Sequence, residues 1–310
     1  MTKRSRLAAS GVLALTTVIV GALAGCSAAE TGSLSGGAVA TPPTAITHVH
    51  AVDVDESRSV VTIATHDGLI TVDISDSADT AQPATVLGDY RGDVMGFVRA
   101  GDRLLLSGHP PYGSSDAPNV GVLDTDLGAR EWSSLALSGE VDFHAMSIAS
   151  SGSTVLIAGI DSATSEVLTS SDVGVSWQRG TAIAARDVAV GVDGASLIAT
   201  TESGLQGSND RGETWAPIAG TPLLVLIESG FDREGNAALF GVDVDGALHS
   251  SADGIEWMPA GALPFVPEAF GVGERGTIVI VSTQRAMRSN DGGATWVDIA
   301  NMMLPLAPPQ

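Results

Sequence analysis

Five of the six histidines in this 310-residue chain lie in its first half, within or beside short apolar segments that read as β-strands. They are His48, His50, His66, His109 and His144. Imidazole nitrogens bind transition metals, and the ring also titrates near neutral pH. Histidines brought together would therefore form a metal site, or a polar pocket suited to a small organic ligand or to acid/base chemistry.

Several of these histidines recur at matching positions of similar strand-like segments. The segments are "HVHAV", "DVMGF", "DFHAM", "RDVAV" and "EAFGV", and their middle residues are His50, Met95, His144, Val188 and Phe270. Two residues earlier, on the same strand face, the first four segments carry His48, Asp93, Asp142 and Arg186. The first three segments thus combine imidazole, thioether and carboxylate groups, whereas the last two place hydrophobic residues in the middle.

This pattern predicts a metal site formed by His48, His50, Met95 and His144. Histidine with methionine favours copper, and histidine with carboxylate favours zinc. The segments "THDG" and "SGHP" put His66 and His109 at the ends of the next strands, which run antiparallel and should end near the same face. We expect a ligand face that also includes Tyr112 and Arg186. The alternative is that the histidines satisfy hydrogen bonds within the fold, which is our interpretation of the isolated His249.

A second pattern is a repeat that ends in tryptophan. The five tryptophans, Trp132, Trp177, Trp215, Trp257 and Trp296, are 38 to 45 residues apart, and each closes a version of Ser-x-Asp-x-Gly-x-Thr-Trp. Three copies are clear, at 170–177, 208–215 and 289–296. A fourth, at 250–257, has Ala252 where the aspartate belongs, and a degenerate copy spans 124–132. Such regular self-similarity predicts a repeat architecture.

The motif resembles the Asp-box, or BNR repeat, of sialidase-like β-propellers. In that family the aspartate and glycine staple a tight turn between the third and fourth strands of a blade, and tryptophan packs between blades. The resemblance implies a structural role for Asp172, Gly174, Trp177, Asp210, Gly212, Trp215, Gly254, Trp257, Asp291, Gly293 and Trp296. It also implies that ligands bind on the opposite face of the disc.

The fold class expected is all-β, a six-bladed β-propeller of four-stranded antiparallel blades, with seven blades if a terminal strand is exchanged at the closure. Six apolar second strands within the domain give about 43 residues per blade. The predicted blades are residues 46–89, 90–139, 140–184, 185–222, 223–264 and 265–301.

The resemblance does not extend to the sialidase active site. That family uses an arginine triad and a late tyrosine nucleophile, but "AITHVHAV" lacks the first arginine, and both tyrosines, Tyr90 and Tyr112, occur early. A glycoside hydrolase of sialidase-like fold, exo-sialidase-like, stays an alternative, with Asp93 and Asp142 as candidate catalytic carboxylates. The chain also resembles secreted bacterial propellers of the glycosylhydrolase-like group.

A third alternative is a protein-interaction or assembly platform that uses loops such as "HPPYGSSDAPN". The repeats resemble those of sortilin-type domains and photosystem II assembly factors, which bind proteins. Likeness of fold does not choose among these functions.

The N-terminus has the order of a secretory signal. Basic residues precede an apolar run and "LAGC", which resembles a lipoprotein lipobox ending at Cys26, the single cysteine. We predict a signal peptide at residues 1–25, a lipidated Cys26 with a flexible tether at 26–45, a propeller at 46–301 and a tail at 302–310. The mature protein would then be an exported bacterial lipoprotein on the outer face of the cytoplasmic membrane, anchored by its lipid.

Composition narrows the partners. Loss of three basic residues on cleavage would change the formal net charge from −21 to −24, and no lysine would remain. Such a surface repels nucleic acid, which we exclude as a partner. A metal ion, a glycan or another small ligand is compatible with it.

Overall fold

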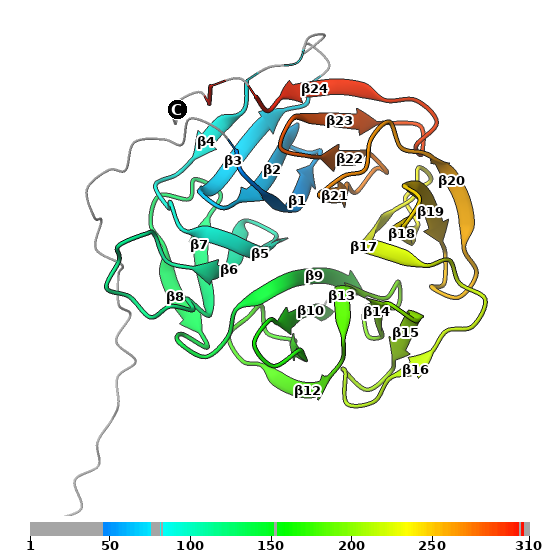
Figure 1. Ribbon diagram of the computed structural model, residues 1–310, viewed down its shortest axis with the longest axis horizontal. Coiled ribbons are helices and arrows are strands. Elements are labelled where there is room, and N and C mark those ends of the chain that lie inside the picture. The colour runs from blue at the N-terminus through cyan, green and yellow to red at the C-terminus, as the bar shows by residue number, and fades with distance from the viewer. Residues whose placement is uncertain (1–45, 76–80, 82, 152–153, 304, 307–310) are drawn as a thin grey trace, which may run out of the picture. The chain divides into compact units, whose positions relative to one another are not determined.

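The computed structural model describes residues 46–75, 81, 83–151, 154–303 and 305–306, which belong to one compact unit. These residues form 24 β-strands and no helix, arranged as a six-bladed β-propeller (Figure 1). Among them there is accordingly no apolar helix of a length that could cross a membrane. The predicted signal peptide, Cys26 and the tether lie outside the described residues.

Each blade is a four-stranded antiparallel sheet made of consecutive strands. Blades one and two contain β1 (Val49–Asp55), β2 (Val60–Thr65), β3 (Gly68–Asp73), β4 (Thr85–Leu87), β5 (Asp93–Ala100), β6 (Arg103–His109), β7 (Val122–Asp126) and β8 (Ser133–Ala136). Blades three and four contain β9 (Phe143–Ser151), β10 (Thr154–Asp161), β11 (Glu166–Ser170), β12 (Gln178–Ala182), β13 (Ala185–Val190), β14 (Leu197–Thr201), β15 (Gly204–Ser208) and β16 (Ala216–Pro217). Blades five and six contain β17 (Leu224–Phe231), β18 (Ala237–Asp243), β19 (Ala247–Ser251), β20 (Met258–Ala262), β21 (Ala269–Val272), β22 (Ile278–Val281), β23 (Arg285–Ser289) and β24 (Val297–Asn301).

The blades form a closed ring around their first strands. Each first strand packs beside the next, and β21 packs beside β1. Between neighbouring blades lie clusters of buried Val, Leu and Ile side chains, since the strands carry apolar residues on the faces they turn to each other. The architecture confirms six blades and the expected four-stranded sheets.

The ring closes without strand exchange among the described residues, so the seven-bladed option is wrong. Side chains join blade six to blade one instead. The Glu268 carboxylate accepts a hydrogen bond from the Val49 amide (3.2 Å), and the Glu56 carboxylate accepts hydrogen bonds from the Thr277 hydroxyl and the Arg275 amide. A hydrophobic cluster that includes residues of both blades buries the rest of this seam.

The first strands of blades one to five each contain a β-bulge near their start. The register shifts leave one extra residue unpaired in each strand: His50, Met95, His144, Arg186 and Val225. A bulge redirects a side chain out of the regular pleat. The alignment of His50, Met95 and His144 from sequence is thus confirmed, but in blade four the equivalent residue is Arg186. Val188, which the sequence pattern aligned with them, lies two residues further along and is buried.

The tryptophan repeats form the turns between third and fourth strands. In the clearest case Asp172 Oδ1 accepts hydrogen bonds from the Ser170 hydroxyl (2.8 Å) and the Ser176 amide (2.8 Å), and Trp177 Nε1 donates to Gly174 (2.9 Å). Gly174 has φ of 82°, which a glycine adopts without strain.

The turn in blade five has an aspartate after all, one residue later than the motif places it. Ala252 is not a gap in the motif, because Asp253 accepts hydrogen bonds from the Ile255 and Glu256 amides (2.8 and 2.9 Å) and Ser251 takes the serine position. The turn is one residue shorter than in the other copies. In blade two Asp126, and not Asp124, accepts the turn amide of Gly128.

Antiparallel pairing puts the start of each first strand, the end of each second strand and the start of each third strand on one face. The tryptophan turns follow the third strands and therefore lie on the opposite face. His48, His66, His109 and Asp142 lie at strand starts or ends on the first of these faces, which we call the histidine face.

Candidate functional site

The histidine face opens into a cavity of about 290 Å³ at the centre of the ring. The first strands of all six blades contribute to its wall. Lining residues that carry reactive side chains include His48, His50, Met95, His144, Arg186 and Glu228. The bulged residues of blades one to four therefore all face this cavity, as the bulge geometry leads one to expect.

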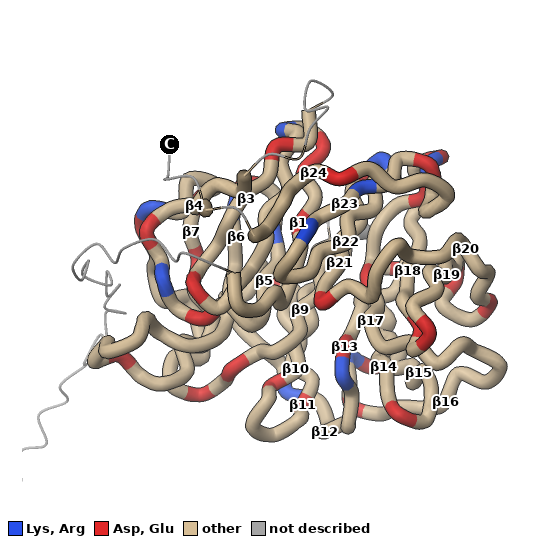
Figure 2. Tube along the Cα trace, turned by 45° about the horizontal axis from the view of Figure 1, so that its top comes forward, with Lys and Arg blue, Asp and Glu red and all other residues tan. Residues whose placement is uncertain are grey.

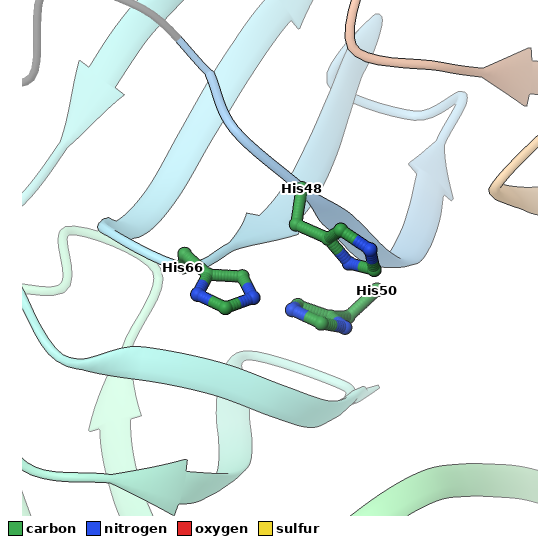
Figure 3. A group of neighbouring side chains, drawn as sticks. All are labelled: His48, His50 and His66. Carbon is green, nitrogen blue, oxygen red and sulfur yellow. The ribbon is translucent and has the colours of Figure 1, made fainter.

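Three histidines of blade one lie together, and two of them, His48 and His50, line the cavity. His48 lies just before β1, His50 is its second residue, and His66 comes from the turn between β2 and β3 (Figure 3). One ring nitrogen from each lies within 4.8 Å of the others. The ring centroids are 4.8 to 5.2 Å apart, so the imidazoles pack against one another. No other cluster of metal-capable side chains in the described part of the chain is this compact.

Asp93, the first residue of β5, lies behind two of these rings. Its Oδ1 is 3.4 Å from His50 Nε2, and its Oδ2 is 3.5 Å from His66 Nδ1. Burial would raise the pKa of Asp93, but the His50 ring that it faces and the nearby His66 and His109 rings lower it below its ordinary value. Asp93 is therefore a carboxylate at neutral pH, placed to orient the imidazoles.

The row of alternating imidazoles and carboxylates continues into blade three. His109 Nδ1 is 3.6 Å from Asp93 Oδ2, and His109 Nε2 is 3.4 Å from Asp142 Oδ2. His144 Nε2 lies 2.8 Å from the same Asp142 oxygen. Burial would raise the pKa of Asp142, but His144, Ser162 and His109 lower it, and the bond to Asp142 raises the pKa of His144.

Several buried polar atoms in this row have no hydrogen-bond partner among the described residues: His50 Nε2, Asp93 Oδ1 and Asp142 Oδ1. Orphaned buried groups cost free energy and are rare in native folds, so each one calls for a missing partner such as a water or an ion. His50 Nε2 and Asp93 Oδ1 face each other at 3.4 Å, so a small shift would pair them. Asp142 Oδ1 has no hydrogen-bond partner among the described residues and favours a bound group at this place.

Two acidic groups that the sequence pattern did not single out also line the cavity. Asp187 accepts hydrogen bonds from the Val188 and Ile227 amides (both 2.9 Å), and burial raises its pKa to about 6. Glu228 has a pKa raised well above its ordinary value by burial and by repulsion from Asp187 and Asp53. In the sequence, Glu228 is recognisable only as a single acidic residue within the apolar run "LLVLIESG" of blade five. It belongs to no repeat or motif.

The other candidate residues lie outside the three-histidine cluster. Met95 lines the cavity, and Arg186 does so from blade four. Tyr112 is fully exposed on the loop after β6 and lines no cavity identified in the described residues. His249 is hydrogen bonded to Asp243 (2.7 Å) in blade five, away from the five histidines.

The three-histidine cluster matches the ligand chemistry of zinc or copper. Imidazoles on a tetrahedral ion at 2.0–2.1 Å have nitrogens about 3.3 Å apart. Since the nitrogens lie up to 4.8 Å apart, small side-chain rotations would bring them onto one ion. His48 and His66 are exposed and free to move in this way.

No family model matches the chain, and no curated protein matches it. Among solved structures, a chain of a nidogen/laminin complex is similar with a TM-score of 0.55, at 10% identity over 80% of this chain and 96% of that one. YCF48 bound to a D1 peptide has a TM-score of 0.47 at 18% identity, over 85% of each chain.

A GH74 xyloglucanase from Xanthomonas campestris also has a TM-score of 0.47, at 18% identity over 84% of this chain. The match spans 46% of the xyloglucanase's own length. At these identities the likeness concerns the fold alone: the chain is a six-bladed β-propeller, and its function must be argued from its own residues.

Proposed function

We propose that this protein is an exported, lipid-anchored β-propeller that binds a transition-metal ion on its histidine face. The ion, zinc or copper, is held by His48, His50 and His66. The observation that carries the proposal is the approach of three imidazole nitrogens to within 4.8 Å of one another beside the central cavity.

Asp93 supports this assignment from behind the ligands. A carboxylate that contacts the second nitrogen of a ligating histidine fixes the ring orientation and makes the ligand more basic. Asp93 lies 3.4 Å from His50 and 3.5 Å from His66, and so reaches two of the three rings. Three histidines with an open position typify sites that bind a further water or ligand.

The choice between the two metals rests on Met95. Its thioether lines the same cavity, and sulfur ligands favour copper over zinc. An all-imidazole set backed by a carboxylate suits zinc. The acidic surface raises the local concentration of either cation: along the described trace, Asp and Glu positions far outnumber the basic ones (Figure 2).

The test of the metal site is elemental analysis of the purified protein prepared without chelator, followed by titration with Zn(II) and Cu(II). We expect one ion or more per chain, and an affinity at least a hundredfold lower in a His48→Ala/His66→Ala variant. Both side chains are exposed, so their removal should leave the fold intact. His249→Ala is the matched control, since it removes a histidine bonded to aspartate elsewhere. Absence of binding at micromolar metal would contradict the proposal.

The anchoring half of the proposal rests on Cys26 and the apolar segment before it. Labelling of the expressed protein with a palmitate analogue should be abolished by Cys26→Ala. Labelling that persists in the variant would refute lipidation at this residue.

A glycoside hydrolase is the second candidate, favoured by a different pair of acids from Asp93 and Asp142. Those two have lowered pKa values, whereas glycosidic cleavage needs one protonated acid. Asp187 and Glu228, with raised pKa values in a cavity of about 290 Å³, satisfy that need. A glycoside screen should then find activity that Glu228→Gln abolishes. No hydrolysis of any glycoside would remove this candidate.

A further inference from the structure

We propose that the histidine face holds a second cation, bound by His109, Asp142 and His144 beside the three-histidine cluster. This inference rests on the proposed metal-binding function and makes the site dinuclear. The second set of ligands comes from blades two and three, whereas His48, His50 and His66 all come from blade one.

Asp142 is the centre of the second set. Its side chain is only 5% exposed, and its Oδ1 has no hydrogen-bond partner among the described residues. The other oxygen, Oδ2, is 2.8 Å from His144 Nε2 and 3.4 Å from His109 Nε2. A buried carboxylate with two imidazoles on one oxygen and none on the other has an open coordination position.

The separations between the groups also favour an ion. Two ligands of a tetrahedral ion, each at about 2.0–2.1 Å, are separated by about 3.3–3.4 Å. His109 Nε2 and Asp142 Oδ2 are 3.4 Å apart, which is close to this separation and longer than an ordinary N–H···O bond of about 2.7–3.2 Å. His144 Nε2 is nearer to the same oxygen, at 2.8 Å, and would move outward to admit the ion.

His109 places the two positions next to each other. One of its nitrogens, Nδ1, faces Asp93, and the other, Nε2, faces Asp142. Asp93 in turn contacts the His50 and His66 rings. The two cations would therefore be neighbours, separated by the width of one imidazole and its carboxylates.

Negative charge lies beside the two positions, because the Asp93 and Asp142 side chains contact the imidazoles and would offset part of the charge of two divalent ions. On binding, the second ion replaces the hydrogen shared by His144 and Asp142, and that proton leaves to water.

The experiment is the stoichiometry of Zn(II) in the full-length purified protein after equilibration with excess zinc and gel filtration, measured by elemental analysis. We expect two ions per chain in the wild type. His144→Ala should retain one, His48→Ala/His66→Ala should retain one, and the control His249→Ala should retain two. His144 is 44% exposed, so its removal is not expected to unfold the chain. Cu(II) loading offers a second readout, because two neighbouring Cu(II) ions alter each other's electron paramagnetic resonance signal and a single one does not.

The outcomes separate the two proposals. One ion in the wild type that is retained in His144→Ala and lost in His48→Ala/His66→Ala would overturn the second site and leave the proposed function standing. One ion lost in both variants would also overturn it, since a single ion would then be shared. Two ions retained in His144→Ala would remove that residue and its site. No ion in the wild type would overturn both proposals.

Discussion

Two groups of aspartates lie on opposite faces of this propeller and differ in their burial and hydrogen bonding. On the turn face, Asp172, Asp210 and Asp291 accept hydrogen bonds from hydroxyls and amides of their own turns, which lower the pKa of Asp291 to about 2. On the histidine face, Asp93 and Asp142 are more buried, contact several imidazoles and retain oxygens without partners. An aspartate whose carboxylate oxygens all accept hydrogen bonds from its own turn therefore has a structural role. A buried aspartate with an oxygen that lacks a hydrogen-bond partner is available to a ligand.

The largest effect should come from Phe143, which connects the two faces. It lies between Asp142 and His144 in sequence, is fully buried, and packs its ring against Trp177 with centroids 4.9 Å apart. Phe143→Ala should lower the free energy of unfolding by about 3–5 kcal/mol, as for other buried phenylalanines. Urea unfolding measures this. A loss under 1 kcal/mol would contradict the close packing of Phe143 in the core.

Asp93→Asn sharpens the comparison on the histidine face. Removal of the carboxylate behind the ligands should weaken metal binding about 10- to 100-fold, because the rings lose their orientation. The metal-free protein should also lose some stability at neutral pH, because the lowered pKa of Asp93 means that its ionised form stabilises the folded state. Calorimetric titration and thermal unfolding check the two parts. Unchanged affinity would show that Asp93 is a structural aspartate like those of the turns.

Ser170→Ala tests the turn face in the same terms. The Ser170 hydroxyl accepts a hydrogen bond from the buried Gly174 amide (2.9 Å), which would be left without a partner. The change should cost about 1–2 kcal/mol of stability and leave metal affinity unaltered. Denaturation and metal titration of the same preparation measure both. A weakened metal site would contradict the division of roles between faces.

Glu228→Gln extends the comparison into the cavity. A raised pKa means that the folded state holds the proton of Glu228 more tightly than the unfolded chain does. The contribution of Glu228 to stability is therefore fully present below about pH 4.5 and is lost as the pH rises through the raised value. The glutamine variant should gain stability over the wild type at pH 8 and much less at pH 4. Equal pH profiles for the two proteins would refute burial of this charge.

The smallest effect is expected at Tyr112, which is fully exposed on its loop. Tyr112→Ala should change stability by less than about 0.5 kcal/mol and leave metal binding unaltered. Thermal unfolding and metal titration check this. A lost metal site would place the loop at the histidine face and revive its role as a ligand contact.

Much of the fold could be predicted from the sequence, because the tryptophan turns repeat at near-constant spacing and each blade repeats one pattern. The bulges could not, since an extra residue in a strand leaves no mark in its composition. His50, Met95 and His144 aligned correctly because their neighbours are alike. In blade four the bulged residue is Arg186, but the sequence pattern aligned Val188 with His50 and its equivalents.

The grouping of the histidines on one face could be predicted in part from the sequence. Residues at strand ends share a face by topology, so the association of His66 with His48 and His50 follows from antiparallel pairing. That His66 is closer to His48 and His50 than to His144 depends on blade spacing, which no residue type encodes. Glu228 was missed because blade five lacks polar residues at its bulge. Its buried acid is recognisable once the neighbouring strands are in place.

The seam of the ring has a consequence for how such a chain can be rearranged. Ile46, ahead of β1, and Met302, after β24, pack into one hydrophobic cluster with Leu306. Every blade is made of consecutive strands, and no strand crosses the seam. A circularly permuted gene, with a short linker joining residue 306 to residue 46 and a new opening between two other blades, would keep every strand pairing. The strand pairings therefore depend on the order of the blades around the ring and not on which blade comes first in the chain.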